Sequence, residues 1–249
     1  MSTLKVNTIR HTGASSDAVT LASDGSCTAK ITNNLSNRNL IINGAMKVAQ
    51  RGTSSTTSGL QATDRWHGSW SGGGVTQEQV DITSGSPFDA GFRKALKLTN
   101  TTASTAASNY RDIRYIIEAQ DIACSGWDSV STSSNITISF WAKASVAQTY
   151  YCFHYVPDST KYYVWSFALS ADTWTKVTKT IPGASGVTIN NDNGNGPSIQ
   201  ICLFYGTDFT TSGQALNTWG AWNSSSRTPD MTNTWANTTN STFELTGVQ

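Results

Sequence analysis

The sequence predicts an all-β protein, a jelly-roll β-sandwich preceded by a short extended N-terminal β segment. Short stretches of alternating apolar and polar residues recur along the chain, most clearly from Asn135 to Lys143. Clusters of Gly, Ser, Asn and Thr separate these stretches, as turns separate the strands of a sandwich. Convincing helical periodicity is absent, so we expect almost no helix.

Composition excludes several classes of function. The 249 residues carry a formal net charge of +1, and only 13% of them are charged. A nucleic-acid partner or an anionic membrane surface would require a stripe of Lys and Arg. The chain has no apolar run that could span a bilayer and no apolar signal core at its N-terminus. Nine tryptophans argue against disorder.

Residues 1–37 are predicted to form a separate segment. Three short strands are expected over Thr3–Ile9, Asp17–Leu21 and Cys27–Ile31. Strands with so few apolar residues cannot bury a core alone. We therefore expect the segment to become ordered against partner chains or a docking surface, through the apolar side chains of Leu4, Val6, Ile9, Val19, Leu21 and Ile31.

Residues 38–249 are predicted to form one sandwich domain. A helical turn is expected between Gly44 and Arg51. Alternation in Ser198–Tyr205 places Ile199, Ile201, Leu203 and Tyr205 on one face. The Asn-, Thr- and Ser-rich stretch from Gln214 to Ser241 is predicted to be a long loop held by its tryptophans. The strands are expected over Gly74–Ile82, Lys94–Thr99, Arg111–Ile122, Asn135–Lys143, Tyr150–Val156, Tyr162–Leu169, Thr173–Ile181, Ser198–Tyr205 and Phe243–Val248.

The four cysteines are far apart in the sequence and form no C-x-x-C pair. We expect Cys27, Cys124, Cys152 and Cys202 to be buried, reduced thiols. Disulfides remain an alternative, and the spacing does not choose among their pairings. No cofactor is expected.

Four patches together resemble a domain of virion appendage proteins of tailed bacteriophages, particularly the tail fibres of marine podophages. The resemblance covers roughly residues 38–249, and Leu4–Ile9 is similar to the opening of such fibre proteins. Family members commonly continue past the last patch, whereas the sequence here stops there. The patches are Asn39–Met46 with Ala49–Gly52 and Asp64–Trp66; Ile138–Ala144 with Trp174–Val177; Ile181–Gly183 with Asn190–Gly196; and Phe243–Gln249.

This resemblance implies a jelly-roll domain similar to carbohydrate-binding modules, displayed on a homotrimeric fibre and performing no chemistry. The implied partners are other copies of the chain, tail or other virion proteins contacted by the N-terminal segment, and polysaccharide on the host surface. The implied location is the virion, after synthesis in the host cytoplasm.

Tryptophans in polar, flexible sequence are the candidate glycan-binding residues. Sugars stack their C–H faces on aromatic rings, and their hydroxyls pair with nearby amides and carboxylates. The alternative for each ring is packing beneath a loop or between subunits. Trp141 and Trp174 lie in strand patterns and are expected in the core. The candidates are Trp66, Trp70, Trp219, Trp222 and Trp235.

Metal binding and catalysis are weakly indicated. The loop containing Asn191, Asp192, Asn193 and Asn195 has alternating side-chain oxygens, but it has one carboxylate and no downstream bidentate Glu, which favours a tight turn. Glycan cleavage requires paired carboxylates. Asp112, Glu118 and Asp121 cluster in the sequence, but salt pairing with Arg111 and Arg114 explains them. We expect no enzyme activity.

Three functions remain open at this stage. The first is a trimeric tail fibre that binds or presents host glycan. The second is a purely structural virion component, such as a head decoration, head fibre or tail adaptor. The third, and the least favoured, is a glycan depolymerase.

Overall fold

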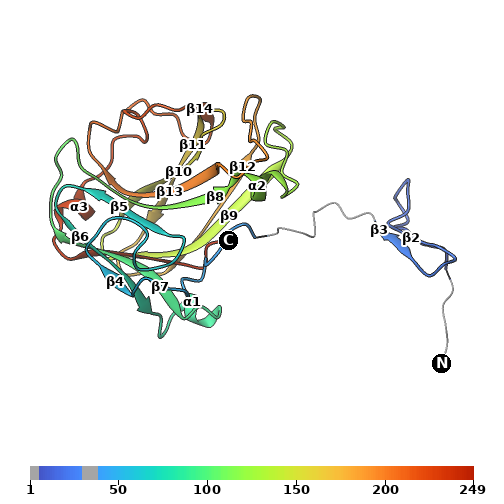
Figure 1. Cartoon of the computed structure of the whole chain (residues 1–249), viewed down its shortest axis with the longest axis horizontal. Helices are drawn as coiled ribbons and strands as arrows, with labels where there is room; N and C mark the ends of the chain where they lie inside the picture. The colour runs from blue at the N-terminus through green and yellow to red at the C-terminus, as the bar shows by residue number, and fades with distance from the viewer. Residues whose placement is uncertain (1–5, 30–38) are drawn as a thin grey trace. The chain divides into compact units, whose positions relative to one another are not determined.

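The computed structural model describes residues 6–29 and 39–249 (Figure 1). The chain divides into two compact units, one before and one after the Arg38–Asn39 peptide bond. Each unit has its own sheet or sheets. The docking and assembly roles predicted for the first unit stay predictions.

The first unit contains a three-stranded antiparallel sheet with no buried side chain among residues 6–27. Its strands are β1 (Thr8–Ile9), β2 (Val19–Leu21) and β3 (Cys27–Ala29). Ile9 is 57% exposed, Leu21 39% and Val6 38%, and Val19 is half-buried. Leu4 and Ile31, predicted to join this apolar surface, lie outside the described residues. In its described part, the sheet therefore has no core of its own.

The second unit is a sandwich of two six-stranded antiparallel sheets. The β10 sheet has the order β14 (Trp219–Ala221), β11 (Lys161–Leu169), β10 (Gln148–Val156), β13 (Asn195–Tyr205), β8 (Tyr110–Glu118) and β5 (His67–Ser71). The β9 sheet has the order β12 (Thr175–Pro182), β9 (Asn135–Ala144), β15 (Ser241–Thr246), β7 (Lys94–Thr102), β6 (Gly74–Asp81) and β4 (Ser54–Ser55). The predicted all-β jelly-roll sandwich is confirmed.

Aromatic side chains between the sheets form the centre of the core. Phe140 of β9 lies 5.5 Å, centroid to centroid, from Phe167 of β11, and Tyr150 of β10 lies 5.3 Å from Phe243 of β15. The predicted alternation of β9 is confirmed, because Phe140 and Ala142 are fully buried. Trp165 donates its Nε1–H to Nε2 of the buried His154 at 3.1 Å, which satisfies both polar groups inside the core.

The segment that enters the domain is fastened to the C-terminal residues. The backbone N–H of Val248 donates to the carbonyl oxygen of Gly44 at 3.0 Å. Trp66 donates its Nε1–H to the carbonyl oxygen of Asn43 at 3.1 Å, and its ring lies 4.9 Å from that of Tyr115. Two ends of the domain, distant in sequence, therefore close one end of the core.

Several predicted elements differ from the structure. The helical turn predicted between Gly44 and Arg51 is not formed, because residues 42–45 and 50–51 are turns and residues 46–49 are irregular. The predicted strand Arg111–Ile122 ends at Glu118, and α2 (Ala119–Ala123) follows it. A β-bulge between Cys202 and Phe204 turns Tyr205 away from the face that holds Ile199, Ile201 and Leu203. The other short helices are α1 (Ser86–Asp89) and α3 (Thr234–Asn237).

The cysteines are divided between the core and the surface. Cys152 and Cys202 are buried as predicted, whereas Cys27 and Cys124 are exposed, contrary to the prediction. Within the described ranges, no helix is both long and apolar enough to cross a bilayer.

Replacing Gly44 by Ala should destabilise the sandwich. An added Cβ would collide with the carbonyl oxygen of Val248. The backbones of Gly44 and Val248 are joined by a hydrogen bond and cannot easily move apart. We therefore expect a loss of about 1–3 kcal/mol in the free energy of unfolding. Urea denaturation followed by tryptophan fluorescence measures it, since all nine tryptophans lie in the second unit.

Gly213→Ala is the matched control, since nothing lies within 4 Å of a Cβ built there. It should change the free energy of unfolding by less than about 0.5 kcal/mol. Equal stabilities of the two variants would contradict the proposed close contact at Gly44.

Candidate functional site

Aromatic side chains cover much of the outer face of the β10 sheet. Strand alternation points Tyr150 and Cys152 into the core and Tyr151, Phe153 and Tyr155 outward. The neighbouring strands add Tyr162 from β11 and Tyr205 from β13. We call the half-exposed members the outer aromatic cluster, which consists of Tyr110, Tyr151, Tyr155, Phe209 and Trp222.

The segment from Phe209 to Met231 packs over this face and completes the cluster. The backbone N–H of Trp222 donates to the carbonyl oxygen of Thr160 at 2.8 Å, which fixes the segment to the β10–β11 turn. The Trp222 ring lies 4.6 Å from Tyr155 and 5.3 Å from Tyr162, centroid to centroid. Tyr155 and Trp222 are thus a half-exposed aromatic pair supported by buried rings.

A buried carboxylate lies beside the cluster. Asp112 of β8 is 3% exposed, and its Oδ2 accepts a hydrogen bond from the Tyr205 hydroxyl at 2.8 Å. Burial raises the pKa of Asp112 to about 6, although the Tyr205 hydrogen bond and the charges of Arg114 and Arg227 act in the opposite direction.

Three polar atoms of this carboxylate and its neighbours have no hydrogen-bond partner among the residues that the structure describes: Oδ1 of Asp112, Nε of Arg114 and Nδ1 of His67. Strand register places these residues together, because His67 pairs with Arg114 and Ser69 pairs with Asp112. Buried polar atoms normally bond to protein, water or a ligand. The outer face thus combines half-exposed aromatic rings with buried polar atoms beneath them that lack a partner among the described residues.

The five predicted tryptophans do not form one site. Trp66 and Trp235 are fully buried, so their prediction as surface stacking residues is wrong. Trp235 donates its Nε1–H to the Thr242 carbonyl oxygen, and Asn100 holds the α3 backbone around it. Trp70 and Trp219 are half-buried against the main core rather than on the outer face. Trp222 alone among the five belongs to the outer aromatic cluster.

Trp141 and Trp174, expected in the core, are half-exposed instead. Trp141 lies on the face of β9 opposite to Phe140, and the ring of Trp174 lies 5.1 Å from Nζ of Lys143. Trp141 lies on a strand as expected, but the opposite sheet covers the other face of that strand. Trp174 precedes β12, which begins at Thr175, so it does not lie on a strand.

The outward tyrosines of β10 were missed as candidates. The sequence did contain a signal, because Tyr151, Phe153 and Tyr155 occupy every second position of an aromatic strand. Asp112 had no such signal, since its partner Tyr205 is 93 positions away.

The carboxylates and the candidate metal loop have structural contacts. Glu118 pairs with Arg65 at 3.0 Å rather than with Arg111 or Arg114, as the sequence had suggested. Oδ1 of Asp192 accepts the backbone N–H of Gly194 at 2.8 Å within the exposed loop that includes Asn191 and Asn193. Asn195 is the exposed first residue of β13. Across residues 6–29 and 39–249, no cluster of three His, Cys, Asp or Glu side chains could hold a metal ion.

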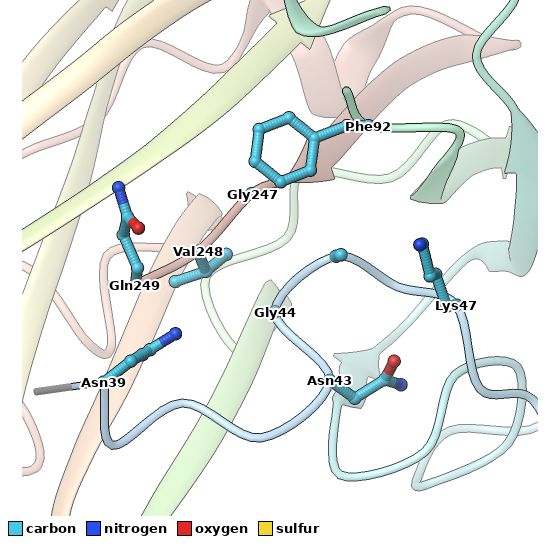
Figure 2. Close-up of a pocket in the computed structure, with 9 residues that line it drawn as sticks. Asn39, Asn43, Gly44, Lys47, Phe92, Gly247, Val248 and Gln249 are labelled. Atoms are coloured by element: carbon cyan, nitrogen blue, oxygen red, sulfur yellow. The ribbon is translucent and has the colours of Figure 1, made fainter. Parts of the chain in front are cut away.

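A separate pocket of about 350 Å³ lies where the entry segment meets the C-terminal residues (Figure 2). Figure 2 shows Phe92, Lys47 and Gln249 around it, with Gly247 and Val248 between them. The side-chain NH2 group of Asn43 donates hydrogen bonds to the carbonyl oxygens of Val48 and Asp64, so both of its N–H groups have partners within the protein.

Comparison with known proteins identifies no family model and no curated protein that matches the sequence. Several solved structures are similar in fold. The enzymatically active domain of tailspike protein 4 of bacteriophage CBA120 is 9% identical with a TM-score of 0.45, and the match covers 84% of this chain and 21% of that one. The present chain thus spans about a fifth of the length of that domain's chain.

Two further solved structures are similar at similarly low identity. One, described under "CBM4 structure and function", is 12% identical with a TM-score of 0.34, covering 70% of this chain and 76% of that one. A putative sugar-binding protein from Bacteroides thetaiotaomicron is 13% identical with a TM-score of 0.35, covering 85% and 98%. These similarities are too distant to identify a function.

Replacing Asp112 by Asn should change how stability depends on pH. The folded-state pKa is raised from 3.8 to about 6, so the carboxyl group stabilises the fold below pH 3.8 and loses this contribution as pH rises through 6. Between pH 4 and 7, Asp112→Asn should therefore gain up to ~3 kcal/mol of unfolding free energy relative to the wild type.

Urea denaturation of both proteins at several pH values tests this difference. The titrations of all other groups contribute equally to both proteins and cancel in the difference between their free energies of unfolding. They include the titration of His154, whose pKa is lowered to about 3 by burial. A difference independent of pH would show that Asp112 is ionised normally in the folded protein.

Proposed function

We propose that the protein is a trimeric tail-fibre protein of a tailed bacteriophage. Its N-terminal segment attaches to the tail and holds the copies together, and its sandwich binds polysaccharide on the host surface. The outer aromatic cluster beside Asp112 carries the glycan-binding part of the proposal. It places stacking rings and unsatisfied polar groups on one sheet face. The resemblance of four sequence patches to tail fibres supports the virion part.

The first unit supports the assembly part of the proposal. A three-stranded sheet with no buried side chain in its described part gains little from folding alone. Ile9 and Leu21 would become buried if copies of this sheet packed together. Several linked sandwiches would then raise the avidity of weak, shallow sugar sites through their effective concentration.

A purely structural virion component is the second candidate. The burial of Trp66 and Trp235 favours it, because it removes two of the five tryptophans from any sugar-binding surface. In this second candidate function, the first unit still assembles the copies of the chain, but the sandwich does not bind glycan.

Light scattering tests the assembly. We expect the mass of three chains for the wild type, and smaller species for Ile9→Asp and Leu21→Asp, because charge on the exposed apolar face prevents its burial. Val130→Asp is the control, since Val130 is 48% exposed but lies in the second unit. A monomeric wild-type protein would remove the trimer from the proposal.

Adsorption of fluorescently labelled protein to host cells tests glycan binding. We expect saturable binding that is lost when surface polysaccharide is stripped. Trp222→Ala should weaken it at least about tenfold, or about 1.4 kcal/mol, because the ring would be the exposed part of the stacking surface.

Trp174→Ala is the matched control for Trp222→Ala, since Trp174 is also half-exposed but lies beside Lys143 of the β9 sheet. It should bind like the wild type. No adsorption by a folded, oligomeric protein would favour the purely structural role.

A further inference from the structure

Arg227 lies over two rings of the outer aromatic cluster and over the buried ring of Tyr205. Cζ of Arg227 lies 4.6 Å from the ring centroid of Phe209 and 5.5 Å from those of Tyr205 and Trp222. Its backbone N–H donates to the Phe209 carbonyl oxygen at 2.7 Å. The guanidinium group is therefore held among rings that come from both the sheet and the segment covering it.

The hydrogen bonds of Arg227 leave one side of the guanidinium group open. Nε donates to the carbonyl oxygen of Ser224 at 3.0 Å. The two Nη atoms make no hydrogen bond within the described parts of the chain, and no carboxylate lies within 4.0 Å of them. Arg227 is half-exposed, so these donors form an end-on fork available to a ligand.

The acidic residues near Arg227 have other partners. Asp112 is buried and accepts from Tyr205, although its charge acts on Arg227 through space. Asp230 is exposed and accepts a hydrogen bond from Oγ1 of Thr210 at 2.8 Å. Burial, and secondly the charge of Asp230, raises the pKa of the Tyr151 hydroxyl. Neither carboxylate forms an ion pair with Arg227.

The surroundings of Arg227 suit an anion with two coplanar oxygens. Aromatic rings exclude water from the faces of the guanidinium group, which strengthens a charge-assisted hydrogen bond at its edge. A carboxylate matches the spacing of the two Nη donors and can accept from both. The neighbouring pair Tyr155 and Trp222 offers a stacking surface to the ring that bears this carboxylate.

We propose that the outer face selects acidic glycans, with Arg227 binding the carboxylate of a uronic acid residue. The inference rests on the proposed glycan-binding function and adds a charge preference to it. Arg227 is the specificity-determining residue, and the rings around it fix its position.

Binding of the full-length protein to defined polymers tests the preference. The probes are polygalacturonate and alginate, their carboxyl-reduced forms, dextran and dextran sulfate, compared by affinity electrophoresis. We expect the wild type to bind at least one acidic polymer at least tenfold more tightly than its carboxyl-reduced form and than dextran sulfate. Arg227→Gln should lose the tenfold preference for the acidic polymer. Its affinity for the carboxyl-reduced form should differ from that of the wild type by less than twofold.

Two further variants separate charge recognition from packing. Arg227→Lys keeps the charge without the fork and should recover only part of the affinity for the acidic polymer. Arg93→Gln removes another arginine that lies over a ring, 3.7 Å from the centroid of Phe88 in the β9-sheet region, and should bind like the wild type. Near-UV circular dichroism reports whether each variant keeps its aromatic packing.

The possible results distinguish the two proposals. Equal binding of acidic and reduced polymers by the wild type, or an equal loss for both in Arg227→Gln, overturns the charge preference. Equal binding of dextran sulfate overturns the carboxylate assignment. Binding to none of the acidic polymers also overturns the preference, and in that case binding to the neutral polymers decides whether the glycan-binding function stands.

Discussion

The sandwich depends on the insertion of its last strand into the middle of a sheet. β15 pairs on one side with β7, through Phe243 and Leu98, and on the other side with β9, through Phe243 and Ala144. Without β15, the β9 sheet separates into a β12–β9 pair and a β7–β6–β4 group. Contacts so distant in sequence are costly in loop-closure entropy, which makes such topologies fold slowly. The residues that follow β15 then fasten the entry segment through Gly44 and Val248.

The completed β9 sheet determines which face of the β10 sheet remains available. Phe140 of the β9 sheet contacts Phe167 of the β10 sheet, and Phe243 contacts Tyr150 in the same way. These contacts bury one face of the β10 sheet in the core. Strand alternation then sends Tyr151, Phe153 and Tyr155 to the opposite face. The same period-two pattern therefore produces both the core and the surface on which the proposed function rests.

Sequence reasoning succeeded where local pattern decides the outcome. The alternation of Asn135–Lys143 correctly placed Phe140 and Ala142 in the core. Reasoning failed where distant contacts decide it. Trp66 lies in polar sequence but packs against Tyr115, and Tyr205 changes face because of a bulge in β13. Asp112 and Arg227 acquire their surroundings from several strands and from one long segment, which no local pattern reveals.

Hydrogen–deuterium exchange with and without host surface polysaccharide tests the central claim most directly, because it locates the contact without any substitution. If glycan binds the outer face of the β10 sheet, exchange should slow in residues 151–156 and 209–231 and stay unchanged in residues 39–47 and 247–249 around the pocket of Figure 2. Slower exchange only around that pocket, or no change anywhere in the sandwich, would contradict the account.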